Sequence, residues 1–152
     1  MDENNLIEKF WQDFLDNTKQ KNLKYDDVFS FGCGSEMETN LAKLVVEGKK
    51  RATTSLHEIY RLENEKIPEK NKLSIVLDGN GKPVAVIKNI EVKIIPFKDI
   101  NEADVQIEGE GDSTLKFWRD AHINVFTKEC EDYNIKFSEE MLVVFEIFEV
   151  IY

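Results

Sequence analysis

The first segment of the chain has a helical pattern of apolar residues. Leu6, Phe10 and Phe14 recur every four residues, Trp11 lies on the adjoining row, and charged residues occupy the opposite side. This spacing predicts an amphipathic helix over residues 3–17 whose apolar side packs against the rest of the protein. The polar side is mixed in sign, which argues against a helix that lies on a membrane surface.

Four more helices are indicated further along the chain. Ser35 with Glu38 three residues later has the spacing of a capping box, and the helix that begins there is predicted to stop at Gly48. Residues 57–66 suit a short helix, and the segment 99–112 suits a short helix followed by a loop. The longest of these helices is predicted over 113–132, with a stripe that includes Leu115, Trp118, His122 and Val125.

Strand patterns lie between these helices. Runs of β-branched and apolar residues predict strands from about Ala52 and over 73–78, 84–95 and 141–152. The aromatic segment 25–34 is predicted to be a connector, and residues 78–81 a hairpin turn. Strands that alternate with helices and are joined partly by a hairpin predict an α+β fold, in which a small mixed sheet or barrel carries helices.

Composition narrows the function classes. The chain has 152 residues and a formal net charge of -10, which fits one domain with a proper core and makes it a poor generic ligand for a phosphate backbone. No apolar run approaches the roughly 20 residues of a membrane span. The acidic first residues do not have the pattern of a secretory signal. Cys33 and Cys130 are too far apart in sequence to match the spacing of a metal-binding or redox-active cysteine motif. A cytoplasmic protein with reduced thiols is therefore expected.

The charge is unevenly distributed. Residues 43–98 contain 12 Lys+Arg and 7 Asp+Glu, a local net charge of +5 inside an acidic chain. Such a basic segment can mark a site for an anionic or polar partner. The alternative is that these lysines only keep strand edges and loops soluble.

A basic, hydroxyl-rich segment follows the second predicted helix. Residues 48–55 read Gly-Lys-Lys-Arg-Ala-Thr-Thr-Ser and concentrate three cations and three hydroxyls where a strand begins. A lysine whose pKa is lowered by neighbouring cations and burial can activate a hydroxyl three residues later. The segment is not a P-loop, because the glycine-rich run before the lysine is missing. A solvated basic turn is the alternative.

Two later segments add acidic groups and a histidine. Residues 108–112 read Glu-Gly-Glu-Gly-Asp, without the ligand pattern of a calcium loop, and an acid here is predicted to accept a proton or orient a base. The alternative is a helix-entry loop, and Asp112 is expected to cap the next helix in either case.

Arg119 and His122 are three residues apart and can face one cavity. A buried core histidine is the alternative for His122.

Taken together, these segments resemble the longer branch of the ASCH domain family. The resemblance covers nearly the whole chain from about Phe29, and its motifs occur in the family's order. The motifs are Phe31-Gly32, residues 48–55, Ile67-Pro68, Pro96-Phe97, residues 108–112, Leu115, Trp118-Arg119, His122 and residues 143–152.

The resemblance implies a PUA-like fold, a compact β-barrel with helices around a cleft that is related to RNA-binding modules. A single domain over residues 1–152 is expected, with a helical extension at about residues 1–30. In a small bacterial branch, the resemblance implies an amidohydrolase that removes the acetyl group from N(4)-acetylcytidine. Its catalytic Lys, Thr and Glu fall on Lys50, Thr53 and Glu108 of this sequence.

The implied reaction assigns a role to each group. Thr53 is expected to be the nucleophile, Lys50 to activate it and hold the oxyanion, and Glu108 to carry the proton to the leaving amine. Substrate contacts are expected from Arg51, Ser55, Arg119 and His122. No cofactor and no metal are expected.

The expected partner is a modified nucleoside or RNA, with no membrane and no DNA. Two alternatives remain open at this point: an RNA-binding module that uses the same cleft, and a ribonuclease that holds RNA through the basic middle segment.

Overall fold

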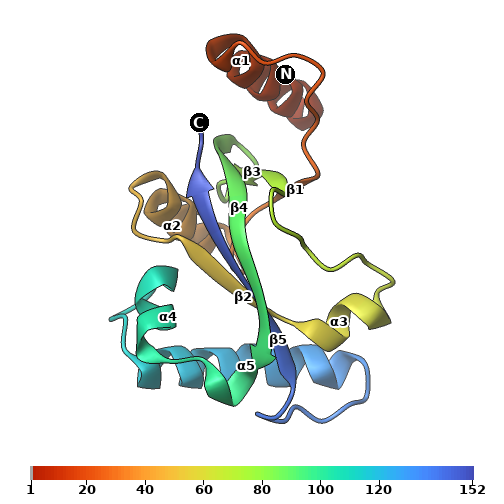
Figure 1. Cartoon of the computed structure of the whole chain (residues 1–152), viewed down its shortest axis with the longest axis vertical. Coiled ribbons are helices and arrows are strands. Elements are labelled where there is room, and N and C mark those ends of the chain that lie inside the picture. The colour runs from red at the N-terminus through yellow and green to blue at the C-terminus, as the bar shows by residue number, and fades with distance from the viewer. Residues whose placement is uncertain (1) are drawn as a thin grey trace. The chain divides into compact units, whose positions relative to one another are not determined.

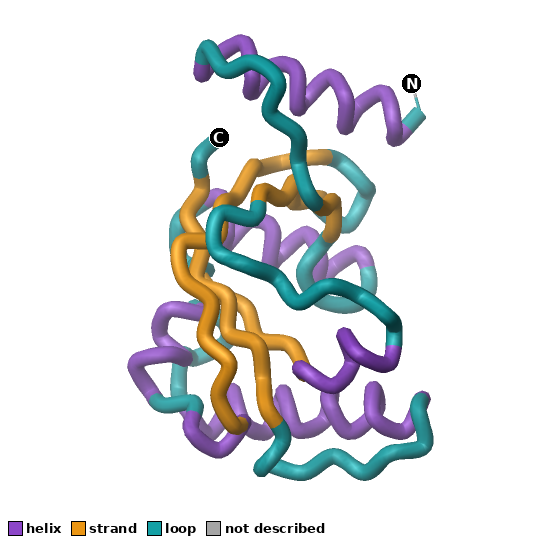
Figure 2. The backbone as a smooth tube through the Cα atoms, turned by 45° about the vertical axis from the view of Figure 1, so that its right-hand side comes forward, coloured by secondary structure: helices purple, strands orange, loops and turns teal. Residues whose placement is uncertain are grey.

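The computed structural model describes residues 2–152 (Figure 1). Its elements in chain order are α1 (Glu3–Thr18), β1 (Asp27–Phe29), α2 (Ser35–Val46), β2 (Ala52–Leu56), α3 (His57–Leu62), β3 (Leu73–Leu77), β4 (Pro83–Pro96), the 3-10 helix η1 (Phe97–Asp99), α4 (Glu102–Glu108), α5 (Leu115–Asp132) and β5 (Leu142–Val150). The chain changes repeatedly between helix and strand, as Figure 2 shows. The predicted α+β class is confirmed.

The strands form a mixed sheet in the order β1-β3-β4-β5-β2. β1 pairs with β3 in parallel, whereas β3 pairs with β4 and β2 pairs with β5 in antiparallel fashion. The register of β2 against β5 places Thr53 opposite Glu146 and Thr54 opposite Phe145. Because successive side chains of a strand point to opposite faces, this register decides which threonine faces which neighbours.

The contacts divide the chain into two compact units. One unit contains the chain up to Lys50, Lys70–Ile90 and Phe148–Tyr152. Within it, the apolar side of α1 buries Trp11 and Phe14 against β3 and β4, and α2 buries Val45. The predicted role of the first helix in core packing is confirmed.

The other unit contains Arg51–Glu69 and Glu91–Ile147. Its core includes Ala52, Leu56, Phe97, Ile100, Val105, Trp118, Phe126, Cys130, Val143 and Phe145. Trp118 of α5 stacks on Phe97, with ring centroids 5.1 Å apart and an interplanar angle of 25°. The inward side of α5 is thereby fixed, and it carries the polar groups described below into the same unit.

Several local predictions were wrong. Residues 27–29 form the short strand β1 rather than part of a connector, because β3 supplies a hydrogen-bonding partner that is distant in sequence. The helix that begins at His57 ends at Leu62 instead of Lys66, and Asn64 just beyond it has a positive φ of 55°.

The predicted helix caps also differ from the structure. Ser35 is already the first residue of α2; the N-cap is Gly34, and no side chain caps this end. Thr114, not Asp112, is the N-cap of α5, and its hydroxyl accepts a hydrogen bond from the Phe117 N–H. Asp112 instead accepts hydrogen bonds from the N–H and the hydroxyl of Thr114, at 2.9 and 2.7 Å.

Two further observations concern the cysteines and the bilayer. Cys33 is exposed, Cys130 is buried, and both are free thiols. Among residues 2–152, no helix has both the length and the apolar character that crossing a membrane requires.

Candidate functional site

A buried carboxylate, that of Glu108, lies within the unit formed by Arg51–Glu69 and Glu91–Ile147. Glu108 is the last residue of α4, and only 1 % of it is exposed. Its Oε2 accepts a hydrogen bond from Nε1 of Trp118 at 2.6 Å and another from Oγ1 of Thr54 at 3.0 Å. A carboxylate that is removed from water needs such donors. These two fix its orientation and leave Oε1 facing the other way.

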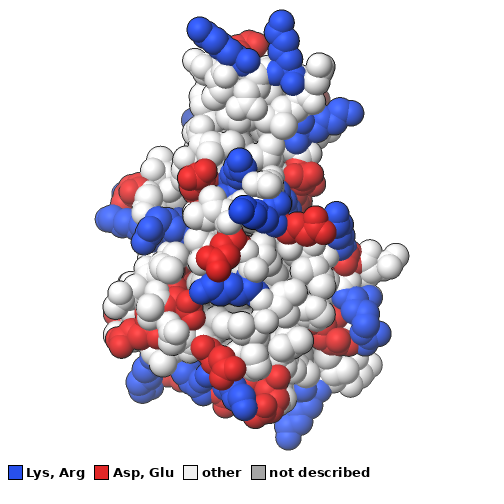
Figure 3. All heavy atoms as spheres, in the orientation of Figure 1, with Lys and Arg blue, Asp and Glu red and all other residues white. Residues whose placement is uncertain are grey.

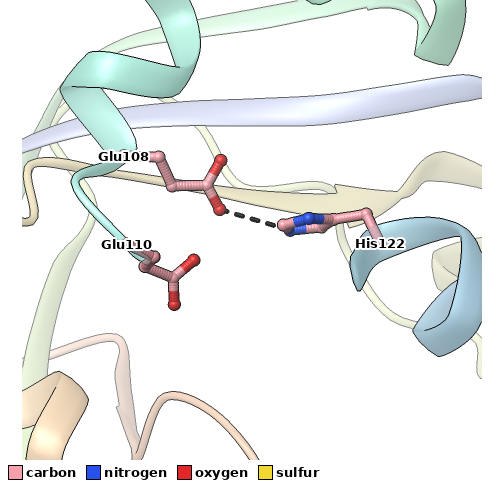
Figure 4. Close-up of side chains that lie close together, drawn as sticks. All are labelled: Glu108, Glu110 and His122. Atoms are coloured by element: carbon pink, nitrogen blue, oxygen red, sulfur yellow. Dashed lines mark ion pairs between the residues drawn. The ribbon is translucent and has the colours of Figure 1, made fainter. Parts of the chain in front are cut away.

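His122 approaches the second oxygen of this carboxylate. It lies one helical turn after Trp118, stacks on that indole with centroids 4.2 Å apart, and places Nε2 3.4 Å from Oε1 of Glu108 (Figure 4). Its Nδ1 lies 2.9 Å from the Trp118 carbonyl oxygen, which can only accept a hydrogen bond, so Nδ1 carries a proton and donates.

The surroundings of His122 favour a positive charge. Burial alone would lower the pKa of this imidazole, but the hydrogen bond and the negative charge of Glu108 outweigh burial. The Trp118 carbonyl and the charge of Glu110 act in the same direction, and the net result is a raised pKa. The pocket around Nε2 therefore stabilises a cation.

Glu110 is the third member of this cluster. One carboxylate oxygen from each of Glu108 and Glu110 and one imidazole nitrogen of His122 all lie within 4.8 Å of one another (Figure 4). The backbone on both sides of Glu110 has positive φ, 72° at Gly109 and 60° at Gly111, which glycine adopts without strain. The two glycines thus turn the chain so that Glu110 lies beside Glu108 and His122.

This arrangement can perform two kinds of chemistry. A buried carboxylate hydrogen-bonded to a threonine hydroxyl and adjacent to an imidazole is suited to moving a proton. Two carboxylates and one imidazole that converge on one point are also a ligand set for a divalent transition metal.

Some of the predicted site residues are brought together and others are not. Glu108 and His122 are brought together as expected. Thr53 is not next to Glu108, because the alternation along β2 turns it to the face opposite Thr54. Arg119 forms an ion pair with Glu139 and lies over the Phe97 ring, 5.7 Å from its centroid.

The basic segment 48–55 divides into exposed and buried positions. Lys49 and Arg51 are exposed, as in a solvated turn, but Lys50 is only 1 % exposed and its Nζ lies 5.0 Å from the centre of the Phe31 ring. The Arg51 N–H donates to the carbonyl of Ile107. The Ser55 hydroxyl is hydrogen-bonded to the Tyr60 hydroxyl at 2.7 Å.

Sequence reasoning missed three contributors to this region. Thr54 follows the predicted nucleophile directly, and the strand register selects it as the partner of Glu108. Glu110 was visible in the Glu-Gly-Glu-Gly-Asp segment, but its spacing gave no indication of His122 as a neighbour. The buried Glu146 faces Thr53 across the β2–β5 pair, inside a run that appeared purely structural.

The family model of the ASCH domain matches residues 27–152. The chain belongs to the ASCH domain family. The expected membership is confirmed. A match over this length, together with the ASCH domain structure described next, also confirms the PUA-like fold that the resemblance implied.

Solved structures support this assignment. The ASCH domain from Lactobacillus crispatus JV V101 is 30 % identical with a TM-score of 0.91, over 97 % of this chain and 95 % of that chain. Protein EF3133 from Enterococcus faecalis V583 is 38 % identical with a TM-score of 0.89, over 97 % of this chain and 88 % of that one. The hypothetical protein PH0355 has the fold in common at 16 % identity, with a TM-score of 0.53, over 82 % of this chain and 97 % of that one. No curated protein matches the sequence.

Proposed function

We propose that this ASCH domain hydrolyses the amide bond of an acylated nucleoside, of the class of N(4)-acetylcytidine. The observation that carries the proposal is the buried carboxylate of Glu108, which accepts the Thr54 hydroxyl hydrogen and lies 3.4 Å from the His122 imidazole. A hydroxyl, an adjacent base and a third group that orients the base are the parts that nucleophilic amide hydrolysis requires.

The proposed reaction has two stages. In the first, Oγ1 of Thr54 attacks the amide carbonyl carbon while Glu108 accepts the hydroxyl proton. The tetrahedral intermediate collapses and the C–N bond breaks. Glu108 passes its proton to the leaving amino group of the nucleobase. In the second, water attacks the threonine ester and releases the carboxylic acid. Lys50 is the proposed partner of the oxyanion.

The choice of hydroxyl departs from the family resemblance for a geometric reason. Thr53 is the residue implied by the motif, but Thr54 is the one that donates to Glu108. Thr53 is therefore retained as the competing nucleophile, with the buried Glu146 opposite it on β5 as its nearest carboxylate across the strand pair. Variants of the two threonines distinguish these assignments.

Charge supports a small substrate over a long polyanion. The formal net charge is -10, and on the face drawn in Figure 3 acidic and basic side chains are interspersed. A long RNA would meet repulsion from the chain as a whole. The proposed contacts to the nucleobase and the ribose come from Arg51, Ser55, Arg119 and His122. Arg119 can reach the substrate only if its ion pair with Glu139 opens.

Product analysis tests this function. The protein is incubated with a panel of acylated nucleosides and, separately, with short RNAs, and the products are separated by chromatography. Release of free nucleoside and carboxylic acid by the wild-type protein, with loss in Glu108→Gln, is the expected result. Cleavage of RNA without amide hydrolysis would replace the proposal with a ribonuclease. RNA binding with steep salt dependence and no products would replace it with a binding module.

A further inference from the structure

We infer that Glu108, Glu110 and His122 form a binding site for one divalent transition-metal ion of the Zn²⁺ class. The three side chains each offer one ligand atom, and these atoms lie within 4.8 Å of one another. Two carboxylates and an imidazole, which gives up its Nε2 proton when the ion binds, match both the charge and the ligand preference of such an ion. Three protein ligands, rather than four, are typical of zinc sites that keep a position for water or substrate.

The distances within the cluster fit the coordination of a small ion. Nε2 of His122 and Oε1 of Glu108 are 3.4 Å apart. Metal–ligand bonds of about 2.1 Å that meet at a tetrahedral angle separate two ligand atoms by about 3.4 Å. These two atoms therefore already have the spacing of one edge of a zinc tetrahedron.

The groups behind these ligands hold them in place. His122 donates its Nδ1–H to the Trp118 carbonyl, which fixes the tautomer that leaves Nε2 for a metal. On Glu108, the Trp118 indole and the Thr54 hydroxyl both donate to Oε2, so Oε1 is turned toward His122. Ligand histidines and carboxylates in metalloproteins are oriented by contacts of this kind.

Glu110 is the adjustable ligand of the three. It is half-buried and sits between two glycines whose positive φ values allow the turn. A Cβ added at Gly111 would lie 2.1 Å from the Phe117 ring, so this turn is built tightly against α5. The backbone therefore brings Glu110 to the pair, and its side chain can close on an ion.

The site adds to the proposed hydrolysis without depending on it. A metal would bind Oε1 of Glu108, whereas the Thr54 hydroxyl binds Oε2. Binding is measured here without any nucleoside, so a failure of the metal site leaves the hydrolysis experiment unaffected, and the reverse also holds.

The test is a titration of chelator-treated full-length protein with Zn²⁺ by calorimetry and with Co²⁺ by visible absorption. We expect one ion per chain and the absorption bands of Co²⁺ in a low-coordinate site. Glu110→Gln removes one ligand from a loop position and should weaken binding at least about tenfold. Asp112→Asn changes an exposed carboxylate in the same loop, outside the cluster, and should leave the affinity unchanged.

Three results would overturn the inference. These are no binding of Zn²⁺ or Co²⁺ by the wild-type protein, an affinity of Glu110→Gln equal to that of Asp112→Asn, and a His122→Asn protein that is folded by circular dichroism and still binds one ion as tightly as the wild type. In the second case, equal weakening of Zn²⁺ binding by both substitutions would indicate diffuse attraction to an acidic surface.

Discussion

The chain contains two tryptophans, which allow a matched test of the buried Glu108 carboxylate. Both indoles are buried, Trp118 at 3 % and Trp11 at 6 % exposure, and both donate a hydrogen bond through Nε1. The acceptors differ. Trp118 donates to the Glu108 carboxylate at 2.6 Å, whereas Trp11 donates to the uncharged carbonyl of Leu23 at 3.2 Å. Replacing each by Phe removes the same atoms from two buried positions.

The expected difference follows from the charge of the acceptor. A hydrogen bond to a charged group contributes about 1.5–3 kcal/mol to the free energy of unfolding, and a neutral one about 0.5–1.5 kcal/mol. The loss of ring volume is common to both substitutions and largely cancels. Trp118→Phe should therefore destabilise the protein by about 1–1.5 kcal/mol more than Trp11→Phe, while a phenyl ring at position 118 can still stack on Phe97.

Urea denaturation followed by circular dichroism measures this difference. The slope of unfolding free energy against urea should be the same in both variants, so that the midpoints report stability directly. In a Glu108→Gln background the extra cost of Trp118→Phe should shrink, since the acceptor is then uncharged. A Trp118→Phe protein that is no less stable than Trp11→Phe would refute the view that the indole of Trp118 stabilises the ionised carboxylate of Glu108.

Two further predictions concern Lys50 and Tyr133. Lys50→Met keeps an apolar stem beside Phe31 and removes the charge, so the rate of amide hydrolysis should fall roughly 10²–10³-fold. The control Lys49→Met changes an exposed position and should have little effect on this rate. Equal losses of turnover in the two variants would indicate a general basic patch. The hydrogen bond from Tyr133 to Glu63, together with burial and nearby acidic charge, raises the pKa of this phenol to about 12. In an ultraviolet pH titration, Tyr133→Phe should accordingly remove a tyrosine that ionises late, and the removal of one that ionises near its ordinary pKa of 10.0 would contradict the hydrogen bond.

The helices were predictable where one periodic face contacts the core. The apolar positions of the first segment and the Trp118 stripe each repeat at helical spacing, and α1 and α5 follow the predicted bounds to within two residues. Val125 was placed on the same stripe as Trp118 but is 49 % exposed, because the outer side of α5 also carries apolar residues. The three-residue strand β1 was not predictable, since its existence depends on pairing with β3.

The candidate site was predictable only in part. Glu108 and His122 were selected by residue type and motif, and the fold does bring them together. The choice between Thr53 and Thr54 depends on the register of β2 against β5. A shift of one residue in this register would exchange the faces on which the two threonines lie. The approach of Glu110 to His122 depends on the turn at Gly109 and Gly111, and the backbone angles of this turn cannot be inferred from the spacing of residues in the sequence. For Lys50, the sequence left open whether the side chain is buried or part of a solvated turn, and in the structure it is almost fully buried.

The most direct test of the proposed function compares Thr54→Val with Thr53→Val in the hydrolysis of N(4)-acetylcytidine. Both substitutions replace a hydroxyl by a methyl group of similar shape, on opposite faces of the same strand. The measurement is kcat/KM from the release of cytidine, with unfolding midpoints to verify that both variants are folded. The account predicts that Thr54→Val abolishes turnover and that Thr53→Val retains most of it. Turnover that survives in Thr54→Val and is lost in Thr53→Val would contradict the assignment of Thr54 and Glu108 as the reacting pair.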